Sequence, residues 1–311
     1  MKAFASFAVL AAVVLPGGGI CVPQEAGVSS QMRNSWLDGL QQGEIDNLFA
    51  RLPNSPGYAV SIIQDGKFAF AKGYGLANLD DDIPITPETS FHLASISKQF
   101  TATAIALLIL DHKIALTDPV AKYIPEAGKY GDGLRIEHLV YMTSGLHEYT
   151  DVPRNNGDPW VTFYYFTRND AIAAALRPDH LEFAPGTQWA YRNINYMLVT
   201  KIVEEVSHQL FSSFMHDRVF GPLGMSHTEI NDDTTEVIPH RATGYAPRSD
   251  PGVVKELNSA GILIKPGEGW VRLVRVFPHF GGSGVFTTLD DLLLWDRNWY
   301  LASLAARRSL S

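Results

Sequence analysis

Ser95 and Lys98 are three positions apart in the stretch FHLASISKQF, which contains the sequence's single Ser-x-x-Lys. Residues with this spacing share one face of a helix, so the Lys98 amine can reach the Ser95 hydroxyl. A serine hydroxyl is a weak nucleophile until a base removes its proton, and a lysine is such a base once burial lowers its pKa. The pair predicts a nucleophilic serine, but an N-cap serine beside a snorkelling lysine fits this segment equally well.

The element that must position this pair is a helix predicted over residues 94–110. Its residues are apolar nearly all round, a pattern typical of a helix buried in the middle of a domain. Ser95 lies at the entrance of this helix, where backbone N–H groups without intrahelical partners can stabilise an oxyanion. One turn of helix is therefore expected to combine a nucleophile, a base and part of an oxyanion hole.

Tyr191 and Asn193 form a second candidate pair, in the sequence's single Tyr-x-Asn. A tyrosine beside a lysine can relay protons between the nucleophile, the leaving group and water. An asparagine can bind a substrate amide with a donor and an acceptor together. Taken singly, Tyr191 is better explained as a half-buried aromatic residue and Asn193 as the N-cap of the helix that follows. The order of the two motifs in one chain favours catalysis over both explanations.

These motifs make the chain similar to the penicillin-recognising serine hydrolases, whose Ser-x-x-Lys motif is well known. It most resembles the class C β-lactamases, D-alanyl-D-alanine peptidases and lactamase-like carboxylesterases. The resemblance extends from about residue 46 to residue 299. The segments that carry it, in the family's order, are PGYAVSIIQDGKFAFAKGYGLAN, FHLASISKQFTATAIALLI, IEHLVYMTSGLHEY, FAPGTQWAYRNINYMLV, VFGPLGMSHTEI and GGSGVFTTLDDLLLW.

The resemblance implies a role for each candidate residue. Ser95 is then the acylated nucleophile, Lys98 its proton acceptor, Tyr191 a second acid/base and Asn193 a ligand of the substrate amide. The TSGL segment is implied to be a structural turn near the site, with Gly145 required for its backbone. We expect no cofactor and no metal.

The chain departs from the family at its third motif, Lys-Thr-Gly or His-x-Gly, which lies on a strand that walls the cleft. That motif normally comes well after the segment that GGSGVFTTLDDLLLW resembles, and here the chain ends soon after it. We expect a chain cut short, or shifted out of frame, before the third motif. The alternative is that His279 and Gly281, in His-Phe-Gly-Gly, supply it.

The fold class implied by the resemblance is α+β, β-lactamase/transpeptidase-like. An antiparallel sheet flanked by helices should contain the runs 58–63 and 68–74, which an Asp-Gly turn joins as a hairpin. A helical subdomain is expected at about 119–239, and C-terminal strands of the sheet are expected to be missing. We assign residues 1–26 to a signal peptide and residues 27–311 to one serine hydrolase domain, incomplete at its C-terminus.

Periodicity predicts several further elements along the chain. Residues 117–126 are expected to be extended, and residues 249–278 mix loop and short strands in no readable order. Helices are predicted at about residues 31–52, 136–142, 169–176 and 195–220, and a strand followed by a helix at the GGSGVFTTLDDLLLWDRNWY segment. The run Asp80 to Asp82 is expected to be a solvated surface.

Charge and composition restrict the partners. The net charge is −8, and no dense Lys/Arg run is present, which argues against nucleic acid and anionic membranes. A small molecule or a peptidoglycan-like peptide is the expected substrate. Lys2 followed by the apolar run Ala3 to Leu15 is typical of a secretory signal peptide, so we expect a periplasmic or extracellular protein. Cys21 is the single cysteine, which excludes an intrachain disulfide, and Ile20 before it disfavours lipid attachment.

Three other functions were weighed against the serine hydrolase. An α/β-hydrolase needs Gly-x-Ser-x-Gly, and the nearest match fails because Val285 occupies the place of the last glycine. A metal hydrolase is disfavoured because the ten histidines are scattered. The strongest alternative is a binding protein, or an inactive remnant of the same fold, that has lost the third motif. Covalent labelling of Ser95 would distinguish it from an enzyme.

Overall fold

The computed structural model describes residues 42–50, 54–152, 167–233, 235–259, 264, 267–273, 280–301 and 304. The chain divides into two compact units, residues 1–52 and 53–311. In the first unit the described element is helix α2 (Gln42–Phe49), which covers the later part of the helix predicted at 31–52. The signal peptide predicted at 1–26 and the third-motif candidate His279 lie outside the described residues.

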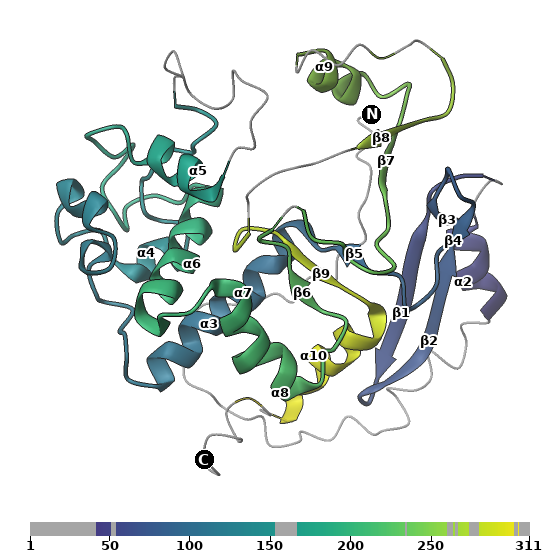
Figure 1. The fold of residues 1–311 in the computed structure, drawn as a ribbon, viewed down its shortest axis with the longest axis horizontal. Helices are drawn as coiled ribbons and strands as arrows, with labels where there is room; N and C mark the ends of the chain where they lie inside the picture. Colours follow the sequence, from purple (N-terminus) through teal and green to yellow (C-terminus); the bar gives the residue numbers. More distant parts are fainter. Residues whose placement is uncertain are drawn as a thin grey trace. The chain divides into compact units, whose positions relative to one another are not determined.

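The predicted hairpin is confirmed as strands β1 (Tyr58–Gln64) and β2 (Lys67–Tyr74), which pair antiparallel. The turn between them needs two residues with positive φ, and Asp65 and Gly66 have φ of 50° and 69°. Helix α10 (Leu289–Leu301) lies beside the hairpin (Figure 1). Its Arg297 donates a 2.6 Å hydrogen bond from Nε to the Gly66 carbonyl, so the turn is tied to that helix.

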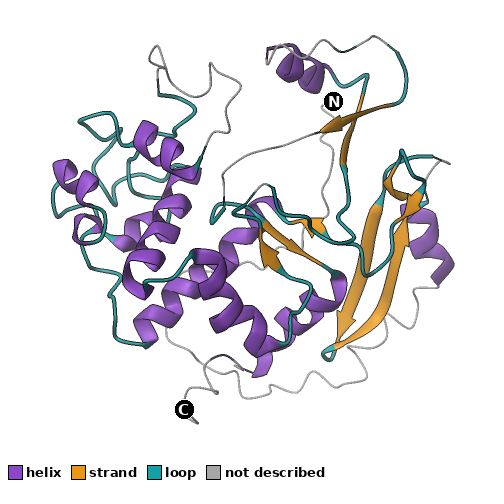
Figure 2. Cartoon of the chain, in the orientation of Figure 1, coloured by secondary structure: helices purple, strands orange, loops and turns teal. Residues whose placement is uncertain are grey.

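Short antiparallel strands complete the sheet structure, as Figure 2 shows in orange. The central strand of a three-stranded sheet is β9, which pairs with β5 and β6. The remaining strands pair as β3 with β4 and β7 with β8. Their bounds are β3 (Leu76–Asn78), β4 (Ile83–Pro84), β5 (Phe91–His92), β6 (Glu229–Ile230), β7 (Gly244–Pro247), β8 (Trp270–Leu273) and β9 (Val285–Thr287). Antiparallel strands mixed with helices confirm the α+β class. The residues from Asp80 to Asp82 are exposed, as predicted.

Two helices form the middle of the second unit. The predicted helix at 94–110 begins with one 3₁₀ segment, η1 (Ala94–Ser97), which leads directly into α3 (Lys98–Leu110). Helix α6 (Asn193–Ser207) lies against α3. Both helices are rich in side chains fully shielded from solvent, and the largest such side chains of the chain include Phe100, Leu108, Ile194 and Met197.

The prediction of a single long helix over residues 195–220 is wrong. Helix α6 ends at Ser207, and His208 has the left-handed φ of 57° that closes a helix. The chain then continues as α7 (Phe211–Met215), a π-helical turn η5 (His216–Phe220) and α8 (Gly221–Leu223). The Glu204 carboxylate accepts a 3.2 Å hydrogen bond from the Phe211 N–H. Apolar side chains are buried on both sides of the break, so the periodicity continues across it and hides it.

Some of the other helices lie close to their predicted positions, whereas others differ from the prediction. Helices α4 (Ile136–Val140) and α5 (Arg168–Ala175) confirm two predictions. The stretch expected to be extended instead holds two 3₁₀ helices, η2 (Val120–Lys122) and η3 (Pro125–Tyr130). A proline is compatible with the first position of a helix, because the N–H it lacks has no partner there. Helix α9 (Pro251–Ser259) was not predicted.

Candidate active site

The Ser-x-x-Lys pair lies where η1 passes into α3. Lys98 Nζ donates a 3.2 Å hydrogen bond to Ser95 Oγ, the contact expected from the three-residue spacing. Ser95 is exposed, whereas Lys98 is only 9% exposed. The residue before the serine, Ala94, has a φ of 46°, a left-handed conformation that is uncommon for a residue with a Cβ. The structure thus combines an accessible hydroxyl, a buried amine and a sharply turned backbone.

Asn193, the first residue of helix α6, and Tyr191, which lies two residues before it, join this pair. Lys98 Nζ donates to Tyr191 Oη at 2.7 Å and to Asn193 Oδ1 at 3.0 Å. Ser95 Oγ and Tyr191 Oη are 2.6 Å apart, within hydrogen-bond distance. Asn193 is the first residue of α6, and Arg192 holds the N-cap position, so the N-cap explanation does not apply to Asn193. All four residues predicted from the two motifs therefore meet around one amine.

Burial changes the chemistry of the Lys98 amine. Removal from water lowers the pKa of Lys98, and this outweighs the opposing effects of the Tyr191 hydroxyl and the Glu148 charge. A lowered pKa increases the fraction of neutral amine, which is the form that can accept a proton. The Tyr191 ring lies 4.8 Å from the Lys98 Nζ. Burial therefore shifts the Lys98 amine toward its neutral form.

A glycine turn ahead of strand β9 forms another wall around Lys98. The Gly282 carbonyl accepts a 2.7 Å hydrogen bond from Lys98 Nζ, and the Gly281 carbonyl accepts a 2.8 Å bond from Thr101 Oγ1. A Cβ added at Gly281 would lie 2.2 Å from Thr200 Cγ2, so a larger residue does not fit. The contact with the Gly282 carbonyl was not predicted, since a backbone contact has no side-chain signature. The role of Gly281 in a third motif stays a prediction.

The TSGL segment forms a turn tightly joined to helix α6. Gly145 has a φ of 73°, and a Cβ there would lie 2.1 Å from the Phe183 carbonyl oxygen, as expected for a glycine required by the backbone. Ser144 Oγ donates a 2.6 Å hydrogen bond to Oδ1 of Asn195, which is fully buried. The Leu146 N–H donates to Ser144 Oγ at 3.1 Å. The turn and the helix bearing Asn193 therefore hold each other in place.

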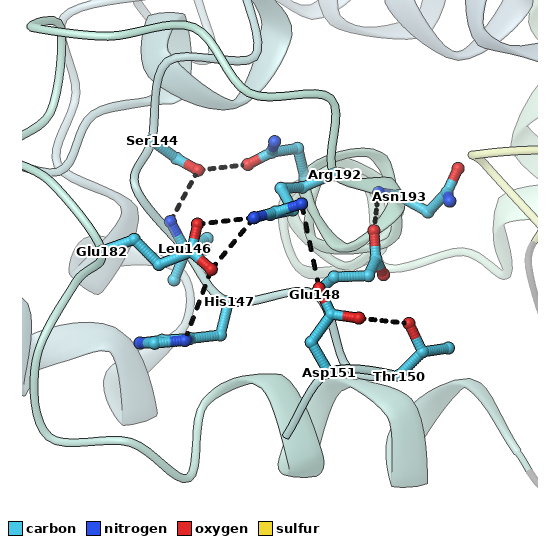
Figure 3. Close-up of polar contacts among 10 residues, drawn as sticks. Ser144, Leu146, His147, Glu148, Thr150, Asp151, Glu182, Arg192 and Asn193 are labelled. Atoms are coloured by element: carbon cyan, nitrogen blue, oxygen red, sulfur yellow. Dashed lines mark hydrogen bonds and ion pairs between the residues drawn. The ribbon is translucent and has the colours of Figure 1, made fainter. Parts of the chain in front are cut away.

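A group of charged side chains surrounds the N-terminus of α6 (Figure 3). The Glu148 carboxylate accepts a hydrogen bond from the Asn193 N–H. Arg192 donates from Nη2 to both oxygens of Glu182, at 3.0 and 2.8 Å. These charged residues were not predicted from the sequence, although Glu148 follows the TSGL turn by two positions. No helix within the described ranges is long and apolar enough to span a bilayer.

Comparison with known proteins identifies a matching family model and several curated proteins of similar sequence. The family model described as Beta-lactamase matches residues 45–311. A D-aminopeptidase from Gluconobacter oxydans (strain 621H) is 28% identical over 256 residues, which are 82% of this chain and 44% of that protein. A Staphylococcus aureus (strain MW2) protein named flp is 30% identical over 205 residues, which are 65% of this chain and 40% of that protein. The chain thus spans less than half the length of these curated relatives.

Solved structures agree in fold. The octameric penicillin-binding protein homologue from Pyrococcus abyssi has a TM-score of 0.63 and 26% identity, over 78% of this chain and 51% of that one. The D-amino acid amidase from Ochrobactrum anthropi SV3 has a TM-score of 0.64 and 21% identity, over 79% of this chain and 66% of that one. These neighbours confirm the β-lactamase/transpeptidase-like fold expected from the sequence.

Proposed function

Because this chain belongs to the beta-lactamase family, we propose that it is a serine hydrolase that forms an acyl-enzyme on Ser95. The observation that carries the proposal is the placement of three side-chain oxygens around one buried amine: Ser95 Oγ, Tyr191 Oη and Asn193 Oδ1 each lie within 3.2 Å of Lys98 Nζ. A nucleophile, a base with a lowered pKa and a second proton carrier in mutual contact are the parts that acyl transfer needs.

The reaction would begin with attack of Ser95 Oγ on the carbonyl carbon of an amide, lactam or ester. Neutral Lys98 accepts the hydroxyl proton, and the carbonyl oxygen takes up the electron pair as an oxyanion. Collapse of this intermediate breaks the bond to the leaving group, which receives a proton through Tyr191. Water then attacks the acyl carbon and gives a proton to Lys98 or Tyr191. The bond from Ser95 Oγ to the acyl carbon breaks and that proton passes to Oγ, which releases the acid and free Ser95.

We propose D-aminoacyl amides and peptides as the first substrates to test. The D-aminopeptidase that is similar over most of this chain gives this choice its support. β-Lactams and small esters remain the alternatives from the sequence, since each also presents an acyl carbon to a nucleophilic serine. Turnover of a D-alanyl amide, nitrocefin and p-nitrophenyl butyrate, measured side by side, would rank the three classes.

The test of the acyl-enzyme is covalent labelling with a fluorescent phosphonate or penicillin, followed by mass spectrometry of the labelled peptide. Ser95→Ala should abolish labelling, and Lys98→Met should slow it by roughly 10⁴-fold, because the nucleophile then keeps its proton. Ser226→Ala and Lys201→Met are the matched controls, at an exposed serine and in a surface ion pair, and should label like the parent.

The competing function is a binding protein of the same fold without turnover. Its signature would be a folded chain that shows no labelling of Ser95 by either probe. Labelling at full stoichiometry in Ser95→Ala would also contradict the proposal, since the acyl group would then be carried elsewhere.

We also propose that the chain is exported, and that a peptidoglycan-like peptide or a small molecule meets it outside the cytoplasm. The support is the sequence of the first residues, with Lys2 ahead of the apolar run from Ala3 to Leu15. Mass spectrometry of the protein recovered from the periplasm or medium should find a mature chain that begins near residue 27. A full-length chain confined to the cytoplasm would contradict export.

A further inference from the structure

Glu148 is a buried carboxylate beside the candidate site, and it takes no part in the proposed acyl transfer. The residue is 8% exposed, and its Oε2 accepts a hydrogen bond from the Asn193 N–H (Figure 3). Its other oxygen, Oε1, is buried and accepts no well-aligned hydrogen bond within the described part of the chain, although the Tyr149 N–H lies near the carboxylate and lowers its pKa. Burying a carboxylate oxygen without a well-aligned partner costs free energy, so such a residue calls for an explanation other than stability.

The hydrogen bond from the Asn193 N–H lets Glu148 fix the position of the first residue of helix α6. The first N–H groups of a helix have no partner within it, and the N-cap residue, Arg192, provides no side-chain cap. Glu148 supplies the acceptor from a position 45 residues earlier in the chain. A negative charge at a helix N-terminus is also favoured by the helix dipole. The carboxylate therefore holds this helix end by geometry and by charge.

The same contact fixes the segment that carries Tyr191. Ala190 donates its N–H to the Met142 carbonyl at 3.0 Å, and Asn193 donates its N–H to Glu148. Tyr191 is thus held on both sides by the stretch from Met142 to Glu148. The Asn193 side chain meanwhile reaches Lys98 Nζ at 3.0 Å, so one residue joins Glu148 to the proposed base.

We propose that Glu148 is a positioning residue for the site, which keeps Tyr191 Oη and Asn193 Oδ1 on the Lys98 amine and acts on that amine through its charge. Glu148 makes no hydrogen bond with Ser95 or Lys98 among the described residues, so it works through Asn193. The inference rests on the proposed function for its effect on catalysis, but its effect on Lys98 is measurable without any turnover.

The charge of Glu148 has a definite sign at Lys98. It raises the pKa of Lys98, in opposition to the larger lowering by burial. Loss of the charge should therefore lower the pKa of Lys98 further, and labelling should reach its plateau at a lower pH. The titratable and charged groups that face these two residues are Tyr191 and Tyr196 around Lys98, and Arg192, Asp151 and Tyr149 around Glu148. A Glu148→Gln substitution replaces none of these five side chains.

Two substitutions separate geometry from charge. Glu148→Gln keeps an oxygen acceptor for the Asn193 N–H and removes the charge, whereas Glu148→Ala removes both. Glu229→Gln on strand β6 is the matched control, because Glu229 Oε1 is also buried without a well-aligned partner in the described ranges and burial raises the pKa of both carboxyls, Glu148 and Glu229. Each variant is measured as the full chain in two ways. The first is the rate of phosphonate labelling against pH, and the second is an NMR titration of ¹³C-labelled lysine. The Lys98 signal is the one that disappears in Lys98→Met.

The expected result is a lower titration midpoint of Lys98 in Glu148→Gln than in the parent or in Glu229→Gln. In Glu148→Ala we expect labelling slowed by about 10²-fold even at the plateau pH, since a small displacement of aligned groups has an effect of that size. An unchanged Lys98 midpoint in Glu148→Gln would overturn the proposal, and this readout holds even where Glu148→Ala does not fold. A parent chain that is never labelled, with a shifted Lys98 midpoint in Glu148→Gln, would refute the hydrolase and support the positioning role.

Discussion

Helix α3 and the β1–β2 hairpin lie in the same unit of the chain and bury their side chains to different degrees. Seven residues of α3 are buried, among them Phe100 and Leu108 with no exposed surface. Every residue of β1 is half-buried, and β2 alternates between exposed and half-buried positions from Lys67 to Phe70 and is then half-buried up to Tyr74. Three of the four candidate site residues lie in η1, α3 and α6, and Tyr191 lies just before α6. A site that depends on distances near 3 Å is thus built on the region whose side chains are closely enclosed.

Loss of a core aromatic should give the largest effect and sharpen this contrast. Phe100 packs against Trp295 at 4.3 Å and Phe220 at 5.8 Å between ring centroids. Phe100→Ala should lower the free energy of unfolding by about 3–5 kcal/mol, because it leaves a cavity under the Ser95 helix. The matched variant in the hairpin, Phe68→Ala at a half-buried position, should lower it by about half as much. Urea unfolding of both variants measures the difference, and equal losses would break the comparison.

A backbone test follows at the TSGL turn. Gly145→Ala should destabilise the fold by about 2–3 kcal/mol, because φ is positive there and the new Cβ meets the Phe183 carbonyl oxygen. Gly131→Ala is the control, since Gly131 has a similar φ of 74° and open space around its Cβ position. Its cost should be about 1 kcal/mol. Thermal unfolding of the two variants separates the clash from the φ strain, and equal shifts would mean that the clash relaxes freely.

The bond between the turn and helix α6 predicts a smaller loss. Ser144→Ala leaves the buried Asn195 Oδ1 without its 2.6 Å donor, which should cost about 1–2 kcal/mol. We also expect slower labelling of Ser95, since Asn195 lies two residues after Asn193 on the same helix. Ser226→Ala, at an exposed position, is the control. A variant with the parent's stability and labelling rate would show that the turn does not support the site.

The smallest effect is expected where the hairpin is tied to α10. Arg297→Met keeps most of the aliphatic stem but removes the donor to the Gly66 carbonyl, so we expect a loss of about 1 kcal/mol. Amide exchange should rise in β1 and β2, while labelling of Ser95 stays as in the parent, because the hairpin provides none of the four site residues. Lys67→Met, an exposed neighbour of the turn, is the control. A fall in labelling with this variant would show that the hairpin and the site are coupled.

Much of the site was predictable because its signals are local. The Ser95–Lys98 spacing follows from helix geometry, and the Asp65-Gly66 turn from its need for positive φ. The contacts that complete the site are not local. Glu148 meets Asn193 across 45 residues, and Lys98 meets the Gly282 carbonyl across 184 residues. Nothing in the local pattern of a single sequence indicates which distant residues will make such a contact.

Errors in the predicted elements have equally specific causes. The break at His208 was hidden because apolar periodicity continues on both sides of it. Helix α9 was missed although Asp250 accepts hydrogen bonds from the N–H groups of Gly252 and Val253. An aspartate followed by a proline is a recognisable helix start, so that signal was available in the sequence. The 3₁₀ turns near Pro119 and Pro125 illustrate that a proline excludes a helix interior but not a helix beginning.

The long separation between Lys98 and the Gly282 carbonyl has a consequence for the timing of synthesis. A ribosome that adds roughly 5–20 residues per second needs roughly 10–40 s to make the 184 residues that separate them. Throughout that interval the nascent chain already contains Ser95, but the carbonyl that holds its neighbouring amine does not yet exist. The contacts around Lys98 can therefore be completed only once the Gly282 turn ahead of β9 has been made, long after Ser95 has been added to the chain.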